Sequence, residues 1–237
     1  MSPLTPSGLA SGLVYYIVFL FSTTLHEAAH AWAAKLGGDL TAYHGGQVSL
    51  DPTAHIRREP IGMVVLPIIS TLLSGWPIGF ASAPYDPRWE LRHPKRAAWM
   101  ALAGPGANLL LVLLAFIGIR AGFYVGIFHP PDAARFGHLV DTTSGVWGGI
   151  AFVLSVFFSM NLVLAVFNVI PVPPLDGSTG IVVLLNTSMA ARYVTWLQEN
   201  RALAMVGMLV AWRVFDVIFD PVFWTAVNLI YPGVRYG

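Results

Sequence analysis

Four long apolar segments constrain the fold of this chain more than any other feature. They cover residues 9–36, 97–128, 145–170 and 202–231. A helix needs about 20 predominantly apolar residues to cross the hydrocarbon core of a bilayer, and each segment meets this length. The composition agrees, since 56% of the residues are hydrophobic and only 11% are charged, against about 25% charged in an ordinary soluble domain. The sequence therefore predicts an all-α polytopic membrane protein with four transmembrane helices.

Two further apolar segments do not fit a simple crossing. Residues 61–81 are apolar but are interrupted by Pro67, Pro77 and several glycines, which is typical of a broken or re-entrant element packed among other helices. Residues 181–185 are too short to cross and predict a short helix. Because no repeat, low-complexity linker or soluble domain is visible, we interpret residues 1–237 as a single membrane-embedded domain.

The loop after the first apolar segment, residues 38–52, predicts a small β-hairpin. Its Gly45-Gly46 pair is flanked by alternating polar and apolar residues, a pattern typical of a turn between two strands. The unpaired edge of such a hairpin can accept an extended peptide by strand addition. An ordinary irregular loop is the alternative.

The most distinctive motif is His26-Glu27-Ala28-Ala29-His30, which lies inside the first apolar segment. Two histidines four residues apart share one face of a helix, so both imidazoles can bind the same metal ion. In zinc peptidases with this spacing, the glutamate between the histidines is the base that takes a proton from water. Polar residues within a membrane span are costly unless they have a role. This favours a metal site over the alternative of two histidines hydrogen-bonded within a helix bundle.

A catalytic zinc ion usually has three protein ligands and one open position, so a third ligand is needed. The chain has no cysteine, which leaves His, Asp or Glu. Asp176 follows a proline-rich break at the end of the third apolar segment. Irregular backbone at membrane depth is tolerated only where protein buries it or where it lines a wet cavity. Taken alone, this pattern is typical of an ordinary helix-ending turn; together with the histidine motif it predicts Asp176 as the third ligand.

These motifs together resemble the site-2 protease family of intramembrane zinc metalloproteases. The resemblance rests on the histidine motif in an early membrane helix, on Gly104-Pro105-Gly106-Ala107-Asn108 opening a later one, and on an asparagine eight residues before the Asp176-Gly177 pair. It covers nearly the whole chain. The family often has two glycines after the aspartate, whereas this chain has Gly177-Ser178. The chain looks like a minimal, core-only member.

The resemblance also implies an activity and the residues that carry it. It implies that His26, His30 and Asp176 bind Zn²⁺, that Glu27 is the catalytic base, and that Asn168 helps to hold the substrate or the oxyanion. The expected reaction is hydrolysis of peptide bonds in the transmembrane segments of single-span or other membrane proteins, as in regulated intramembrane proteolysis. A regulatory membrane partner for substrate capture or gating is a further expectation.

The positions of the histidines and the aspartate predict the topology. Both lie near the C-terminal ends of their segments, so they share one membrane depth only if these helices run parallel, with an odd number of crossings between them. Residues 97–128 supply one crossing, so residues 61–81 are predicted not to cross. Most cationic residues then gather at one end of the bundle: Lys35, Arg57, Arg58, Arg88, Arg92, Lys95 and Arg96. The positive-inside rule predicts that the active site of this integral membrane protein opens towards the cytoplasm.

Several polar residues and glycines in the later segments also carry predictions. Arg213, Asp216 and Asp220 are spaced at i, i+3 and i+7, which places them on one helical face. An internal ion pair between the arginine and a carboxylate is favoured over a second metal site. In the second segment, Gly104-Pro105-Gly106 predicts a close approach of two helices beside the site, and Asn108 predicts a hydrogen bond across helices.

The charge and the remaining glutamates limit the alternatives. A net charge of +1 with scattered Lys and Arg offers no basic surface for nucleic acid. A different class of membrane zinc peptidase would need a glutamate as third ligand, and outside the motif only Glu59, Glu90 and Glu199 are present, all in predicted loops. The other alternative is a catalytically silent membrane protein that binds a metal or a partner. The intact Glu27 argues against it, because a structural zinc site is closed by four ligands and needs no base.

Overall fold

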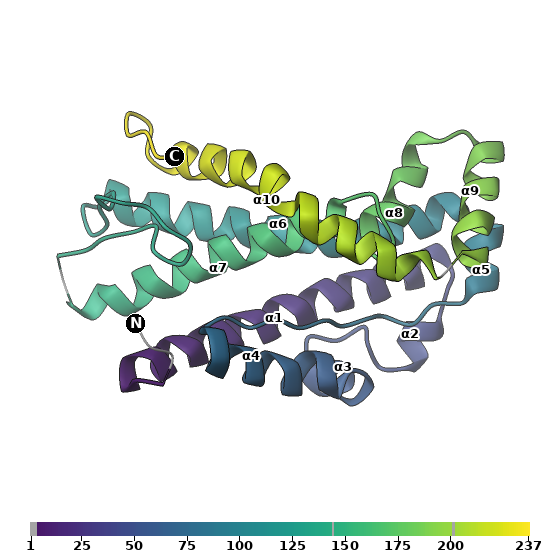
Figure 1. Ribbon diagram of the computed structural model, residues 1–237, viewed down its shortest axis with the longest axis horizontal. Helices are drawn as coiled ribbons and strands as arrows, with labels where there is room; N and C mark the ends of the chain where they lie inside the picture. Colours follow the sequence, from purple (N-terminus) through teal and green to yellow (C-terminus); the bar gives the residue numbers. More distant parts are fainter. Residues whose placement is uncertain (1–3, 144, 201) are drawn as a thin grey trace.

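The computed structural model describes residues 4–143, 145–200 and 202–237. These residues form a bundle of helices, with no β-strand among them (Figure 1). The four long helices are α1 (Pro6–Gly37), α6 (Pro94–Tyr124), α7 (Gly145–Val169) and α10 (Leu203–Ile230). The shorter helices are α2 (Thr41–His44), α3 (Pro52–Arg58), α4 (Leu66–Ser74), α5 (Pro87–Arg92), α8 (Asp176–Gly180) and α9 (Thr187–Glu199). The predicted all-α fold is confirmed.

The long helices include the membrane spans. α1, α6 and α7 are each long and apolar enough to cross a membrane, and α10 adds a fourth span when it is taken with α9, from which it is bent by 102°. The ends of α10 show how far it reaches. Gly207 is so close to the Pro173 carbonyl, beyond the end of α7, that a Cβ would lie 1.8 Å from it, and Arg120 near the end of α6 donates to the Ile230 carbonyl at 2.9 Å. α10 therefore runs along the bundle from one end to the other.

The core of the bundle is α6, which packs against both α1 and α7 (Figure 1). α6 runs opposite to its two neighbours, so α1 and α7 are parallel and their C-terminal ends lie at the same end of the molecule. Small buried residues of α6, including Ala97, Ala101 and Gly104, allow the close approach. This orientation is the one that the positions of the histidines and the aspartate require.

Residues 61–81 enter and leave the bundle at the same end, as predicted. A π-helical turn (Ile61–Val65) continues into α4, which ends at Gly75 in the left-handed conformation with a φ of 76°. The chain then reverses and runs back along the same helix. The Phe80 N–H donates to the Gly62 carbonyl at 3.0 Å, which places the returning chain beside the start of the segment. A Cβ at Gly79 would lie 2.3 Å from that carbonyl, so only glycine permits this contact. The segment is therefore re-entrant.

The predicted β-hairpin in residues 38–52 is wrong. The Asp39 carboxylate accepts hydrogen bonds from the Thr41 N–H at 2.9 Å and from the Thr41 hydroxyl at 2.6 Å. An aspartate that accepts from a backbone N–H two residues later starts a helical turn. The turn becomes α2, which the Gln47 N–H closes by donating to the Ala42 carbonyl at 3.0 Å. The side chain of Asp39 thus decides the local structure, and the Gly45-Gly46 pair follows a helix instead of joining two strands.

The predicted ion pair within α10 is also wrong. Arg213, Asp216 and Asp220 are exposed, and within the described residues none of them takes part in a salt bridge. The buried residues of α10 are all uncharged, and they are Gly207, Ala211, Phe219, Phe223, Val227 and Ile230. The spacing places these charges on one face correctly but does not bring them into contact.

Candidate active site

Two histidines of α1 lie against α6 at a position where α6 has no side chain. His26 and His30 are both buried, and they share one face of the helix because four residues separate them. The facing residue is Gly104, where a Cβ would lie 2.5 Å from Nε2 of His26 and 2.3 Å from Nε2 of His30. Any larger residue would displace both imidazoles. The close helix approach predicted at Gly104 is confirmed.

The second nitrogen of each imidazole is bonded to an oxygen acceptor. Nδ1 of His30 lies 2.8 Å from the Met100 carbonyl, and Nδ1 of His26 lies 2.5 Å from Oδ1 of Asn108. A carbonyl oxygen only accepts, so each Nδ1 carries the proton and each Nε2 presents a lone pair. In metal sites, a hydrogen bond from the imidazole nitrogen that does not bind the metal fixes the orientation of the ring.

The amide orientation of Asn108 is itself fixed by a neighbour in α7. Nδ2 of Asn108 donates to Oδ1 of Asn161 at 2.8 Å, and Nδ2 of Asn161 donates to the Phe157 carbonyl at 2.9 Å. Because the Phe157 carbonyl can only accept, the donor and the acceptor of each hydrogen bond in this series are determined. The network links α1, α6 and α7, and it confirms the predicted cross-helix bond from Asn108.

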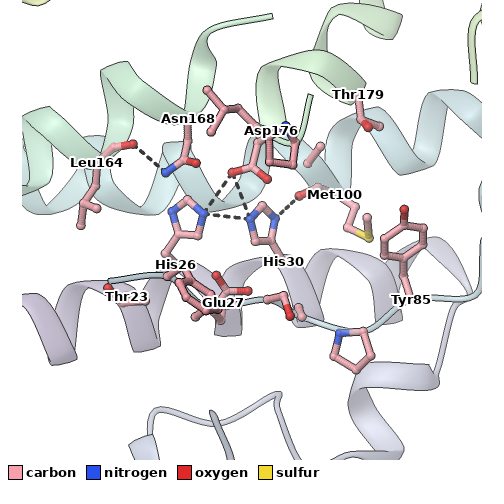
Figure 2. A pocket seen from close by; sticks show the side chains of 18 of the residues that line it. Thr23, His26, Glu27, His30, Tyr85, Met100, Leu164, Asn168, Asp176 and Thr179 are labelled. Carbon is pink, nitrogen blue, oxygen red and sulfur yellow. Dashed lines mark hydrogen bonds and ion pairs between the residues drawn. The ribbon is translucent and has the colours of Figure 1, made fainter. Parts of the chain in front are cut away.

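Asp176 meets both histidines at a single point (Figure 2). Its Oδ2 atom lies 3.0 Å from Nε2 of His26 and 3.3 Å from Nε2 of His30, and these two nitrogens are 2.9 Å apart. A tetrahedral Zn²⁺ with bonds of about 2.0–2.1 Å holds neighbouring ligand atoms about 3.3 Å apart. The three atoms therefore have the spacing and the chemistry of a zinc ligand set.

The break after α7 delivers Asp176 to this point. α7 ends at Val169, and Asp176 is the first residue of α8. A Cβ at Gly177 would lie 2.1 Å from the Val169 carbonyl, so the tight return requires glycine next to the aspartate. This return places the Asp176 carboxylate beside Nε2 of both histidines.

Glu27 points into the same site without a partner. Its side chain is 5% exposed, and its Oε2 atom has no hydrogen-bond partner among the described residues. Its carboxylate and the two imidazoles can each bring one ligand atom within 4.8 Å of the others. An unpaired buried carboxylate is destabilising, so its retention indicates a functional role.

Comparison with known proteins gives the family to which this site belongs. A family model described as "Peptidase family M50" matches residues 14–213, which include every residue of the site. The chain belongs to peptidase family M50. The resemblance to the site-2 proteases is confirmed, and so is zinc as the metal of this M50 protein.

Curated relatives of this M50 protein have names that describe zinc metalloproteases. "Putative zinc metalloprotease YwhC" of Bacillus subtilis is 32% identical over 68% of this chain and 64% of its own length. "Putative zinc metalloprotease Rip2" of Mycolicibacterium smegmatis is 27% identical over 87% of this chain and 70% of its own length. The chain thus spans about two thirds of the curated relatives that it matches. No solved structure matches the chain.

A cavity of about 590 Å³ adjoins the M50 motif. One wall is the returning chain after α4, residues 79–85, and another is the end of α7 with Phe167 and Asn168. Met208 of α10 also lines it. Figure 2 shows Glu27, His26, His30 and Asp176 around one point within this cavity. The cavity therefore has room for a peptide segment beside the three atoms that form the zinc ligand set.

The amide of Asn168 faces the cavity and is partly engaged within its own helix. It lines the cavity near His26 and Asp176 (Figure 2). Its Nδ2 atom donates to the Leu164 carbonyl of its own helix at 2.9 Å. An amide nitrogen has two hydrogens, so one remains for a second acceptor.

The three glutamates considered as alternative ligands have other partners or positions. Glu90 lies in α5, not in a loop, and its carboxylate accepts a hydrogen bond from Gln198 at 2.6 Å. Glu59 accepts one from the Ser82 hydroxyl at 2.6 Å. Glu199 ends α9 and does not line the cavity beside the histidines. Asp176 occupies the position that a glutamate ligand would need.

Proposed function

We propose that this M50 protein is an intramembrane zinc endopeptidase that hydrolyses peptide bonds in the transmembrane segments of other membrane proteins. The main support for this proposal is that a complete set of zinc ligands lies beside a carboxylate that has no hydrogen-bond partner. His26, His30 and Asp176 converge on one point, and Glu27 lies beside them with a free carboxylate oxygen. A structural zinc site has no use for such a base.

The residues divide the chemistry between them. Zinc, when bound, lowers the pKa of a coordinated water to about 7 and polarises the peptide carbonyl. Glu27 accepts the proton of the attacking water and then donates it to the amine that leaves, which requires no other acid in the site. The hydrogen bonds to Met100 and Asn108 hold the imidazoles in the tautomer that presents Nε2. The free N–H of Asn168 donates to the oxyanion, a contribution of about 3 kcal/mol in other proteases.

The substrate must present an extended segment to this site, because the hydrogen bonds of a helix shield its peptide bonds. The cavity wall formed by residues 79–85 is itself extended, without regular secondary structure. An unwound substrate segment can lie against it and pair through its backbone. We therefore propose the strand-addition role for the returning chain, in place of residues 38–52. Substrates with helix-breaking residues near the cut should therefore be cleaved faster.

The distribution of charge supports a site that opens towards the cytoplasm. The end of the bundle that carries α2, α5 and α9 bears six cationic residues, which are Lys35, Arg88, Arg92, Lys95, Arg96 and Arg192. The opposite end bears only Arg120, Arg135 and Arg235 among the described residues. The cation-rich end is the cytoplasmic end by the positive-inside rule.

The proposal is tested with a panel of single-span membrane reporters and purified protein in detergent, with the cut mapped by mass spectrometry. We expect cleavage inside or at the edge of the membrane segment, loss of cleavage on zinc chelation, and recovery on adding Zn²⁺. A matched reporter in which leucines replace the helix-breaking residues should be cut more slowly. Cleavage confined to the soluble parts of the reporters, or unaffected by zinc removal, would show that the proposed function is wrong.

A further inference from the structure

Arg213, Asp216 and Asp220 form a charged stripe on α10 that the proposed protease chemistry does not use. All three side chains are exposed, whereas Ala211 is buried against the bundle. A residue two positions after a buried one lies about 200° around a helix, so Arg213 is on the face opposite Ala211. In Figure 1, α10 lies on the outside of the bundle, in front of α6 and α7. The exposed stripe therefore lies on the outer surface of the bundle.

The stripe also lies deep along the membrane-spanning length of α10. Gly207 packs beyond the end of α7, and Ile230 bonds to Arg120 near the opposite end of the bundle. At a rise of about 1.5 Å per residue, Asp216 lies about 14 Å from the first of these levels and about 21 Å from the second. Charged side chains at such depth are costly in lipid and are normally paired. Within the described residues, the stripe has no oppositely charged partner in an ion pair.

We propose that the stripe is the interface through which this protein pairs with a second copy of itself in the membrane. Two copies inserted in the same direction are related by a two-fold axis along the membrane normal, so their α10 helices run parallel. Arg213 of each copy then faces Asp216 of the other, three residues or about 4.5 Å further along the helix. The stripe contains both signs of charge at this offset, so it complements itself and forms two equal ion pairs.

The same symmetry makes a distinct prediction for the third charge. Asp220 lies one turn beyond Asp216, too far along the helix to share Arg213. In the pair it faces Asp220 of the other copy, so like charges oppose each other. Asp220 therefore limits the stability of the pair, while Arg213 and Asp216 stabilise it.

Cysteine cross-linking tests the pairing directly, because the chain contains no cysteine of its own. Leu209 lies on the stripe, four residues before Arg213, and is 71% exposed; Val210 is 43% exposed and points about 100° away from it. The full chain is expressed with Leu209→Cys or with the matched control Val210→Cys and oxidised in native membranes. We expect a disulfide-linked pair of chains from Leu209→Cys only. No linked pair, equal linkage at both positions, or linkage only to a different protein would overturn the proposal.

Charge variants in the Leu209→Cys chain then test the ion pairs. Arg213→Asp should lower the linked fraction at least about tenfold, because it leaves buried charges opposed. The double variant Arg213→Asp with Asp216→Arg should restore it, and Asp220→Asn should raise it. Zinc content measured on every variant shows that the fold is intact, since the metal ligands lie on other helices. Linkage that does not respond to Arg213→Asp, or that the double swap fails to restore in zinc-loaded protein, would contradict the pairing.

Discussion

Replacing Gly104 by alanine should remove zinc from the site without unfolding the protein. The added Cβ would lie 2.3 Å from Nε2 of His30 and 2.5 Å from Nε2 of His26, whereas ordinary contact begins at 3.4 Å. Since backbone hydrogen bonds hold both helices, the imidazoles must yield, and His30 would have to retreat by about 1.1 Å. Zinc ligand distances tolerate deviations of only about 0.2 Å.

We expect Gly104→Ala to lower the zinc affinity at least about 100-fold. This is the upper end of the effects seen when residues around the metal ligands are mutated. Affinity is measured by competition with a chromogenic chelator on the purified protein. The matched control is Gly106→Ala, two residues further along α6, where a Cβ would meet nothing within 4 Å. Both substitutions raise helix propensity equally, so only the contact with the histidines differs. Equal zinc affinity in the two variants would refute the claim that Gly104 gives the histidines their space.

Three further predictions address the network, the re-entrant segment and the ligand set. Asn108→Ala removes the acceptor for Nδ1 of His26, so zinc affinity should fall about 10–100-fold; an unchanged affinity in the chelator assay would exclude a role in orienting the ring. Gly75→Ala places a side chain at a φ of 76°, so the free energy of unfolding should fall by about 1–2 kcal/mol, measured as a lower thermal midpoint, with Gly106→Ala as the control. Asp176→Asn removes the charged ligand while keeping its shape, so zinc content should fall well below that of native protein by metal analysis; full occupancy would mean that another residue is the third ligand.

The membrane helices and the re-entrant segment could be predicted because each follows from a property of the chain itself. Apolar length fixes the spans, since every backbone group must be paired inside lipid. The re-entrant path of residues 61–81 followed from a count of crossings, because the two histidines and Asp176 can meet only if α1 and α7 are parallel. Pro67 and the glycines around it indicated only that the segment is irregular.

Other features depend on contacts that residue identity does not reveal. The Met100 carbonyl accepts a hydrogen bond from His30. Every residue has a backbone carbonyl, so the sequence cannot indicate which one does this. Asn161 was missed, although a polar residue in the middle of an apolar segment was a usable signal, and it proves fully buried beside Asn108. The hairpin failed because one side chain, Asp39, started a helical turn. The prediction of an ion pair in α10 was wrong because residues that share a helical face are not always in contact.

One comparison tests whether Glu27 is the general base of the zinc site. Native protein and Glu27→Gln are loaded with zinc, and their cleavage of the same membrane reporter is measured together with zinc content. Glu199→Gln is the control, since Glu199 ends α9 and does not line the cavity. We expect equal zinc in all three proteins, with kcat reduced about 10²–10⁴-fold in Glu27→Gln alone. Undiminished cleavage by zinc-loaded Glu27→Gln would contradict this role for Glu27.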